Sequence, residues 1–212
     1  MKPVTIICLI MLVINANAQI GKGKNVLSGN ILYLTNNASS SGSSIENNFS
    51  SLSIMPRYGR FFGEKTEVGL TIGYNWMTEN SDDNLNYYAG KSTTGLFLVG
   101  PYARFYQNLA ERFYFNFTVS ATVFTGSQEV TTTSSWSAST KTKYDAFELQ
   151  AGIGPGLTYF FNDHWATNFS LGVINYDMRS STNKETDNKT TTNNFTFGIN
   201  AGGLGFGIGF YF

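Results

Sequence analysis

The sequence predicts an all-β fold: a transmembrane, eight-stranded, antiparallel up-and-down β-barrel. Three observations predict it. Segments in which large apolar residues alternate with small or polar ones recur along most of the chain, as in strands whose two faces meet different environments. Short turns and long polar connections alternate strictly between these segments, which is the order of a membrane barrel. Aromatic residues make up 16% of the chain, which has 22 Gly and only 4 Pro.

The first 18 residues have the form of a cleaved secretory signal. Lys2 precedes a largely apolar run from Val4 to Ile14, and Ala16 and Ala18 form an A-x-A site before Gln19. The run is too short for a spanning helix, which needs roughly 20 residues. The predicted organisation is a signal peptide over 1–18, a short, mobile periplasmic leader over 19–24 and an outer-membrane barrel domain over 25–212.

Cleavage would leave 194 of the 212 residues, a length suited to a single domain. It would remove the single Cys, Cys8, so the mature chain would offer no disulfide, no cysteine metal site and no thiol nucleophile. The full chain has 14 basic and 14 acidic residues, and loss of Lys2 leaves 13 basic ones and a net charge near −1. We expect no nucleic-acid partner, because such a partner requires a basic surface.

The eight predicted strands are joined by connections of two kinds. The strands cover residues 25–35, 49–60, 66–77, 93–106, 112–125, 144–160, 165–177 and 194–212. The long connections are 36–48, 78–92, 126–143 and 178–193, and the short ones lie around 61–66, 108–111 and 161–164. The long connections are rich in Ser, Thr, Asn and Lys, so we expect four solvated, mobile extracellular loops.

Within each strand, residue parity separates an apolar face from a polar or glycine-rich face. The first strand is the least regular, because Leu32 and Leu34 lie opposite its other apolar residues. The apolar faces are Val68, Leu70, Ile72, Tyr74 and Trp76 in the third strand; Phe113, Phe115, Phe117, Val119, Ala121 and Val123 in the fifth; Phe147, Leu149, Ala151, Ile153, Pro155 and Leu157 in the sixth; and Trp165, Thr167, Phe169, Leu171 and Val173 in the seventh. Such faces over about 10 residues suit a tilted strand in lipid.

The last strand ends in strict alternation. Leu204, Phe206, Ile208, Phe210 and Phe212 form its apolar face, and Gly205, Gly207, Gly209 and Tyr211 form the other. A strand of this kind would expose an apolar edge in a soluble protein, whereas a closed barrel has no edge. Phe195, Phe197 and Ile199 have the opposite parity. The switch predicts a β-bulge or glycine kink at 201–203, or an upper half that lies outside the membrane.

Aromatic residues gather where the two lipid–water interfaces should lie, so we expect two belts. The group near the short turns is Tyr58, Phe61, Phe62, Phe105, Tyr106, Phe113, Phe160, Phe161, Trp165, Phe210 and Phe212. The group near the long connections is Tyr74, Trp76, Phe124, Tyr144 and Tyr176.

The repeated strand-end phrases resemble those of the small eight-stranded outer-membrane β-barrel family, the OmpX-like or OmpA-barrel type of Gram-negative bacteria. These phrases occupy 53–74, 97–107 and 152–173, and each has a Pro several residues before an aromatic-rich turn. The chain end, with Gly207, Phe210 and Phe212, is similar to the outer-membrane assembly signal. The resemblance implies a monomer integral to the outer membrane, in contact with its lipid and inserted by the barrel-assembly machinery. One such scaffold carries many functions.

Five charged residues have inward parity and form a candidate polar network in the lumen: Arg57, Glu67, Arg104, Arg112 and Glu148. An outward Arg at the bilayer centre would cost about 2–4 kcal/mol. The network either fills a narrow barrel, with Glu67 between Arg57 and Arg104, or forms an anion-binding vestibule, since the arginines outnumber the acids. The interior of an eight-stranded barrel is just wide enough for side chains to fill, so we expect no open pore.

Catalytic, cofactor and metal sites are not expected. A lipid-modifying barrel enzyme would pair a Ser nucleophile with a His base, but the single His, His164, lies in a short turn with no Ser at a suitable spacing. Asp82, Asp83 and Asp187 lack the spacing of a calcium loop. The glycine-rich end lacks the Lys-Ser/Thr of a phosphate loop.

The leading hypothesis is therefore a non-enzymatic outer-membrane protein that anchors four polar loops for surface interaction, adhesion or envelope integrity. The alternative is a conduit for small solutes or anions through the Arg-rich lumen. A lipid-modifying enzyme is the third and least favoured hypothesis. The residues do not identify an extracellular partner.

Overall fold

The computed structural model describes residues 20–39, 45–83, 88–134, 137–170, 174–198 and 205–212. The predicted signal peptide, with Ala16, Ala18 and Gln19 at its cleavage site, lies outside the described residues. The strands are β1 (Asn25–Ser39), β2 (Ile45–Phe61), β3 (Thr66–Asp83), β4 (Tyr88–Ala110), β5 (Phe113–Ser134), β6 (Ser137–Phe160), β7 (Trp165–Ser170), β8 (Ile174–Asn183), β9 (Lys189–Phe197) and β10 (Gly205–Tyr211). The described part of the chain contains no helix long and apolar enough to cross a membrane.

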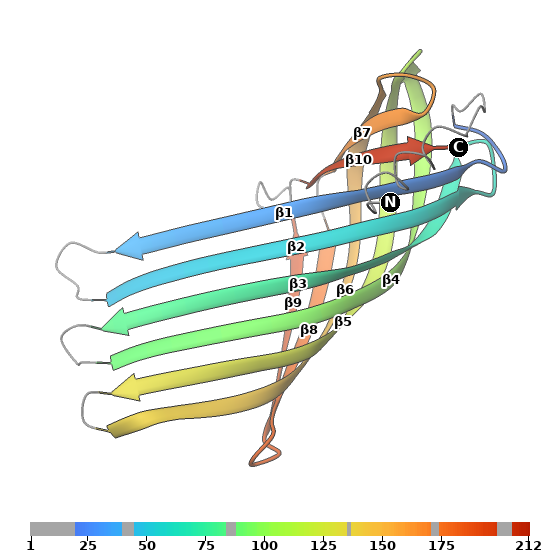
Figure 1. Ribbon diagram of the computed structural model, residues 1–212. Helices are drawn as coiled ribbons and strands as arrows, with labels where there is room; N and C mark the ends of the chain where they lie inside the picture. Colours follow the sequence, from blue (N-terminus) through green and yellow to red (C-terminus); the bar gives the residue numbers. More distant parts are fainter. Residues whose placement is uncertain (1–19, 40–44, 84–87, 135–136, 171–173, 199–204) are drawn as a thin grey trace, which may run out of the picture.

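Eight of these strands close into a ring of antiparallel neighbours (Figure 1). Each of β1 to β6 pairs with the next strand along the chain, and β10 pairs with both β7 and β1. β8 and β9 form a hairpin that pairs along the outer half of β6. The predicted eight-stranded antiparallel up-and-down fold is therefore confirmed. Its seventh strand is described as β7 and β8, and its eighth as β9 and β10.

The breaks in these two strands coincide with undescribed residues. The parity switch predicted at 201–203 lies outside the described residues. On either side of it, Phe197 in β9 and Phe206 in β10 are both exposed. β9 pairs with β8, whereas β10 pairs with β7 and β1.

The prediction of long loops is wrong for most of the residues concerned, because the strands continue through them. β3 extends to Asp83, and the β5–β6 ladder extends to the pair Ser134 and Ser137. These segments are polar but rich in Thr and Ser, and β-branched Thr suits a strand. A ladder already started by apolar pairs can therefore propagate outward as a polar hairpin. In Figure 1 these long hairpins leave the ring at the end opposite the C-terminus.

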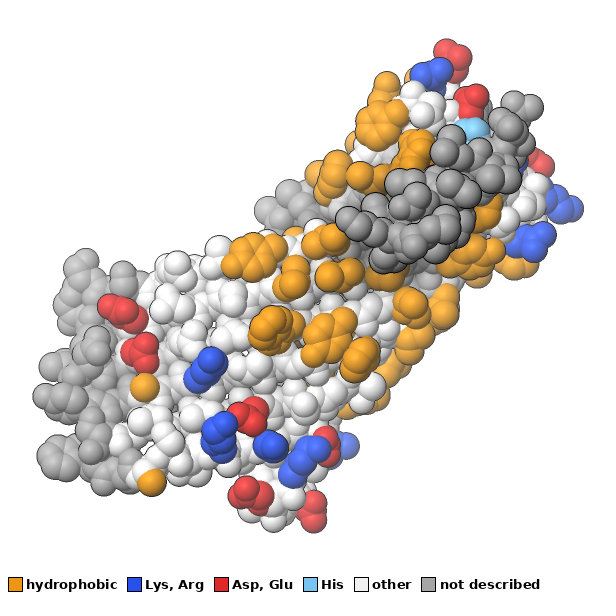
Figure 2. Space-filling view, in the orientation of Figure 1, with side chains coloured by type: hydrophobic (Ala, Val, Ile, Leu, Met, Phe, Trp, Pro, Cys, Tyr) orange, Lys and Arg blue, Asp and Glu red, His pale blue; other side chains and the backbone are white. Residues whose placement is uncertain are grey.

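The outer surface of the ring carries an apolar band bounded by polar residues. In β3 the exposed side chains run from Val68 to Trp76 at alternate positions, and Thr78 and Asn80 follow them. In β4 they run from Phe97 to Phe105. The space-filling view shows hydrophobic side chains over the middle of the face and charged ones toward its ends (Figure 2). This length is close to the roughly 9–11 residues that a tilted strand needs to cross lipid.

Both predicted belts are only partly outward-facing. Tyr58, Phe62 and Phe161 are exposed near the short turns, as expected. The buried exceptions are Phe61, Tyr106, Phe124 and Phe160. The belts are predicted from the position of each ring along its strand, but residue parity decides whether a ring points to the lumen or to the outer surface. These four rings have the same parity as the lumen-facing residues of their strands, so they point inward.

The barrel interior is the core. Near the short turns a buried cluster comprises Val26, Phe61, Tyr106, Tyr114, Phe160, Ala166 and Tyr211. Ile20 packs against this cluster, and the Gly23 amide donates to the Phe61 carbonyl at 2.8 Å. The described residues of the predicted leader therefore lie against the base of the barrel.

Candidate functional site: a closed lumen

Glu67 and Arg104 lie at the centre of the lumen near its short-turn end. They are Cα partners in the β3–β4 register, so both side chains point to the same face of the sheet. Glu67 is 0% exposed and Arg104 is 4% exposed. The Arg104 Nη1 atom lies 3.8 Å from the Glu67 Oε2 atom. The predicted inward placement of both residues is thus observed, and the structure joins them as a buried ion pair.

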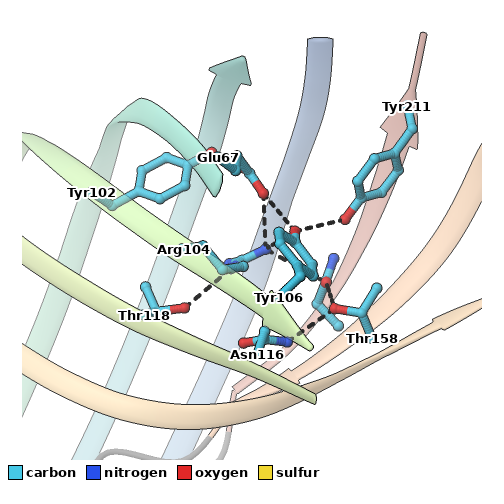
Figure 3. Close-up of polar contacts among 9 residues, drawn as sticks. Glu67, Tyr102, Arg104, Tyr106, Asn116, Thr118, Thr158 and Tyr211 are labelled. Carbon is cyan, nitrogen blue, oxygen red and sulfur yellow. Dashed lines mark hydrogen bonds and ion pairs between the residues drawn. The ribbon is translucent and has the colours of Figure 1, made fainter. Parts of the chain in front are cut away.

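Two tyrosines of β4 donate hydrogen bonds to the Glu67 carboxylate (Figure 3). The Tyr102 hydroxyl donates to Oε1 and the Tyr106 hydroxyl to Oε2, each at 2.5 Å. Tyr211 lies 3.2 Å from the Tyr106 oxygen. Because an ionised carboxylate only accepts, the Tyr106 O–H donates its hydrogen bond to Glu67, and the Tyr211 O–H donates to the Tyr106 oxygen. The carboxylate therefore has a donor on each oxygen and a cation beside it.

A second set of hydrogen bonds joins Arg104 to strands β5 and β7. Its Nε atom donates to Thr118 at 3.1 Å and its Nη1 atom to the Asn168 Oδ1 atom at 3.5 Å. Asn116 donates to the Thr158 hydroxyl, which donates to Asn168. The polar group thus links β3, β4, β5, β6, β7 and β10, six of the eight ring strands. A buried polar network in which members satisfy one another is rigid and specifies one arrangement.

Beneath this network, toward the short turns, aromatic rings fill the lumen. Phe61 packs on Tyr106 with ring centroids 5.4 Å apart, and Phe160 packs on Tyr211 at 4.7 Å. Tyr114 meets Phe160 edge-on at 5.6 Å. We call this aromatic layer together with the Glu67 network the plug. Its members are Glu67, Tyr102, Arg104, Tyr106, Tyr211, Phe61, Tyr114 and Phe160.

Two glycines give the plug its space. A Cβ on Gly59 would lie 2.5 Å from the Tyr102 hydroxyl and 2.6 Å from the Glu67 Oε1 atom. A Cβ on Gly69 would lie 2.3 Å from the Tyr58 carbonyl and 2.7 Å from the Tyr102 ring. The inward glycines of these strands are therefore needed for close approach to Tyr102 and Glu67.

Arg57 lies beside the plug without joining its ion pair. Its guanidinium is 5.6 Å from the centroid of the Tyr102 ring, and that of Arg104 is 5.7 Å from the same centroid. The Nε atom of Arg57 is buried and has no hydrogen-bond partner among the described residues. The expectation that Glu67 bridges Arg57 and Arg104 is thus met only for Arg104.

The structure does not bring the other two predicted lumen residues to this group. Arg112 is exposed in the β4–β5 turn, where it donates to the Phe161 carbonyl at 3.1 Å. Glu148 is buried higher in the barrel and pairs with Arg179 of β8 at 2.9 Å. Arg112 has inward parity, but it lies beyond the end of the ladder, where parity no longer sets direction.

Sequence reasoning missed several members of the network. Tyr211 was placed on the inner face but assigned no role, and Asn116, Thr158 and Asn168 were not singled out. All four have inward parity close to the short turns, which is a signal that could have found them. Arg179 could be found only from the β6–β8 register, because its partner Glu148 is 31 residues away.

The predicted assembly-signal residues lie on β10 and at the chain end. Phe210 stacks on His164 at 5.8 Å and on Phe212 at 5.6 Å. The Asn162 side chain accepts from the His164 and Trp165 amides, so His164 is part of a side-chain-capped turn. Within the described residues no group of three His, Cys, Asp or Glu side chains is placed to hold a metal ion.

No protein-family model matches the chain. No curated protein sequence is similar to it at a significant level. Among solved structures, the chain is similar to the outer membrane protein OprG from Pseudomonas aeruginosa, with 15% sequence identity and a TM-score of 0.45 over 93% of this chain and 99% of that one. A likeness this remote carries no information about what the barrel does.

Proposed function

We propose that the protein is an integral outer-membrane β-barrel that holds polar β-hairpins at the cell surface for interaction with its surroundings, and that it catalyses no reaction. The apolar band of about nine residues, with polar hairpins extending from one side only, carries this proposal. A barrel satisfies every backbone group in lipid without leaving an edge, and its apolar outer face requires lipid.

The polar hairpins support a role in surface contact. β4, β5 and β6 have 23, 22 and 24 residues, far more than a crossing needs. Beyond the apolar band their side chains are polar and charged. Lys141 and Lys143 pair with Glu129 across the β5–β6 hairpin, at 3.1 and 3.9 Å. Exposed ion pairs of this kind suit water on both faces of a sheet.

The plug favours an anchor over a conduit. Glu67 and Arg104 bind each other and the wall, and Phe61 and Phe160, each 1% exposed, fill the lumen below them. A conduit would need a water path through this layer. Contact of the ring with outer-membrane lipid, insertion by the barrel-assembly machinery through Phe210 and Phe212, and a monomeric state complete the proposal.

Protease treatment of intact Gram-negative cells that express the chain tests the orientation. We expect trypsin to cut at Lys141 or Lys143 from outside the cell, while the ring stays intact. Lys65, in the β2–β3 turn at the other end, is the matched control. It should be cut only after the outer membrane is permeabilised. Recovery of the chain in the soluble fraction, or cleavage at Lys65 in intact cells, would contradict the proposal.

A hairpin replacement tests the surface role. In the variant, residues 129–143 are replaced by a two-residue Asn-Gly turn, so that the paired residues Gln128 and Tyr144 flank the turn and the register of the remaining ladder is kept. We expect unchanged membrane fractionation and reduced attachment of the cells to host cells or matrix. A variant that attaches as well as the wild type would remove this hairpin as the contact surface.

A further inference from the structure

A small cavity lies in the lumen on the long-hairpin side of the plug. Its volume is about 30 Å³. A cavity needs about 10–15 Å³ to hold one water molecule, so this one has room for about two particles of that size. The polar residues that line it are Ser28, Asn30, Arg57, Arg104, Asn116, Asn168 and Ser170.

The charged side chains that line the cavity are all positive. It contains two guanidinium groups, hydroxyls and amides, but no Asp or Glu. The nearest carboxylate, Glu67, has its oxygens occupied by Tyr102, Tyr106 and Arg104. Two cations and one anion leave this part of the lumen with an excess positive charge of one. A partly buried charge without a counter-charge is costly, so the site favours a negative guest.

Two buried side-chain atoms without partners belong to residues that line this cavity. They are the Nε atom of Arg57 and the Oδ1 atom of Asn30. The Arg57 N–H can only donate. The two ends of an Asn amide exchange by a half-turn of the side chain, which would present the Asn30 NH₂ group instead. Each residue can then contribute a donor to the cavity, and the lack of a lining Asp or Glu beside two guanidinium groups makes an anion the guest that the charges favour.

We propose that this cavity binds one small monovalent anion of halide size between Arg57 and Arg104. The guest neutralises the excess charge and accepts the hydrogen bond that the Arg57 Nε atom does not make to any described residue. The plug lies on one side of the cavity, so the anion is held in the lumen and does not pass through it. This inference is independent of the surface role of the hairpins.

Thermal unfolding of the folded barrel in detergent micelles tests the proposal. Chloride and bromide are compared with gluconate, which is too large for the cavity, at one ionic strength and pH. We expect a saturable rise of a few degrees in Tm with chloride or bromide, as for any ligand that binds only the folded state. The rise should be absent in R57Q and retained in R112Q, which removes an exposed Arg outside the cavity.

Crystals grown in bromide give a second readout that does not depend on a variant. We expect an anomalous peak between the guanidinium groups of Arg57 and Arg104. If R57Q does not fold, the proposal is tested by the difference between the wild-type Tm in chloride and in gluconate, together with this bromide peak. Equal Tm values in chloride and gluconate, or a cavity without a bromide peak, would overturn the proposal. So would an R57Q protein whose Tm still follows chloride.

Discussion

At the scale of single residues, the closed lumen depends on how Glu67 is satisfied. Its carboxylate is fully buried, accepts from two tyrosines and faces Arg104. Removing one partner of a buried ion pair is far more harmful than removing an exposed pair, because the remaining charge has no solvent. The hydrogen bonds from Arg104 to Thr118 and Asn168 keep that guanidinium in place.

We predict that E67Q lowers the free energy of unfolding by about 3 kcal/mol, because the Arg104 charge loses its counter-charge while it stays buried. Equilibrium unfolding in urea, followed by heat-modifiable mobility on a gel, measures the change. E129Q removes an exposed carboxylate instead and should shift the midpoint far less than E67Q does. An E67Q midpoint equal to that of the wild type would show that the network does not hold the barrel together.

Gly59 offers an independent test of the same network. G59A places a methyl group within 2.6 Å of the Tyr102 hydroxyl and the Glu67 carboxylate, so one of these buried groups must move. We expect a loss of about 1–3 kcal/mol in the free energy of unfolding, as for other overpacked cores. G63A is the matched control, since its Cβ would meet only Thr66, at 3.9 Å. Equal stability of the two variants would contradict the packing described above.

At the scale of elements, the β5–β6 hairpin shows what sequence patterns can and cannot predict. The alternation of apolar and polar residues correctly predicts the half of each strand nearer the short turns, and it predicts that the Glu67 and Arg104 side chains point into the lumen. Composition assigned the outer half to loops, because isolated polar segments do not hold together as strands. The ladder overrides this composition, since each outer pair follows from the pair before it. The pairing of Glu148 with Arg179 depends on the register between β6 and β8. Parity within one strand predicts which face a residue is on, but it does not predict which residue of the next strand lies opposite.

The Glu129 pKa tests whether this hairpin is formed. The hydrogen bond from Lys141, followed by the charges of Lys141 and Lys143, lowers the Glu129 pKa below its usual value. A carboxyl whose pKa is lowered on folding contributes to stability above its unfolded pKa, and the contribution is lost as pH falls through the folded pKa. We predict an NMR titration midpoint for Glu129 below that of an unfolded peptide, and a return toward it in K141Q. A mobile loop would give the peptide value in both proteins.

The ladder between β1 and β10 is short. Among the described residues, four Cα pairs join these strands, from Val26 with Tyr211 to Gly29 with Ile208, and backbone hydrogen bonds between Asn25 and Phe212 extend the ladder at its end. A Cβ on Gly209 would lie 3.4 Å from the Ser28 Cβ atom, close to the spacing that a disulfide bridges. We predict that S28C/G209C forms a disulfide on mild oxidation of the folded barrel. In S28C/G207C the second cysteine lies two residues from the partner of Ser28, so this variant should not form a disulfide, and equal cross-linking of both variants would exclude this register.

At the scale of the whole molecule, the structure is a closed ring with different surfaces along its length. The short turns and the plug occupy one end, an apolar band surrounds the middle, and polar hairpins extend from the other end (Figures 1 and 2). This arrangement separates two tasks. In the proposed function, the band and plug hold a stable barrel in lipid, and the hairpins contact other molecules. An anion in the lumen would serve the first task.

The central claim is that the barrel crosses the membrane with its lumen closed. Current measurement across planar bilayers tests it most directly. The protein is delivered by fusing proteoliposomes with the bilayer, and heat-modifiable mobility of protein from the same proteoliposomes verifies that it is folded and inserted. The account predicts no stable conductance steps for the wild type, and steps for a Y106A/Y211A variant, which removes two rings of the plug. Stable, ohmic steps from the inserted wild-type protein would contradict it.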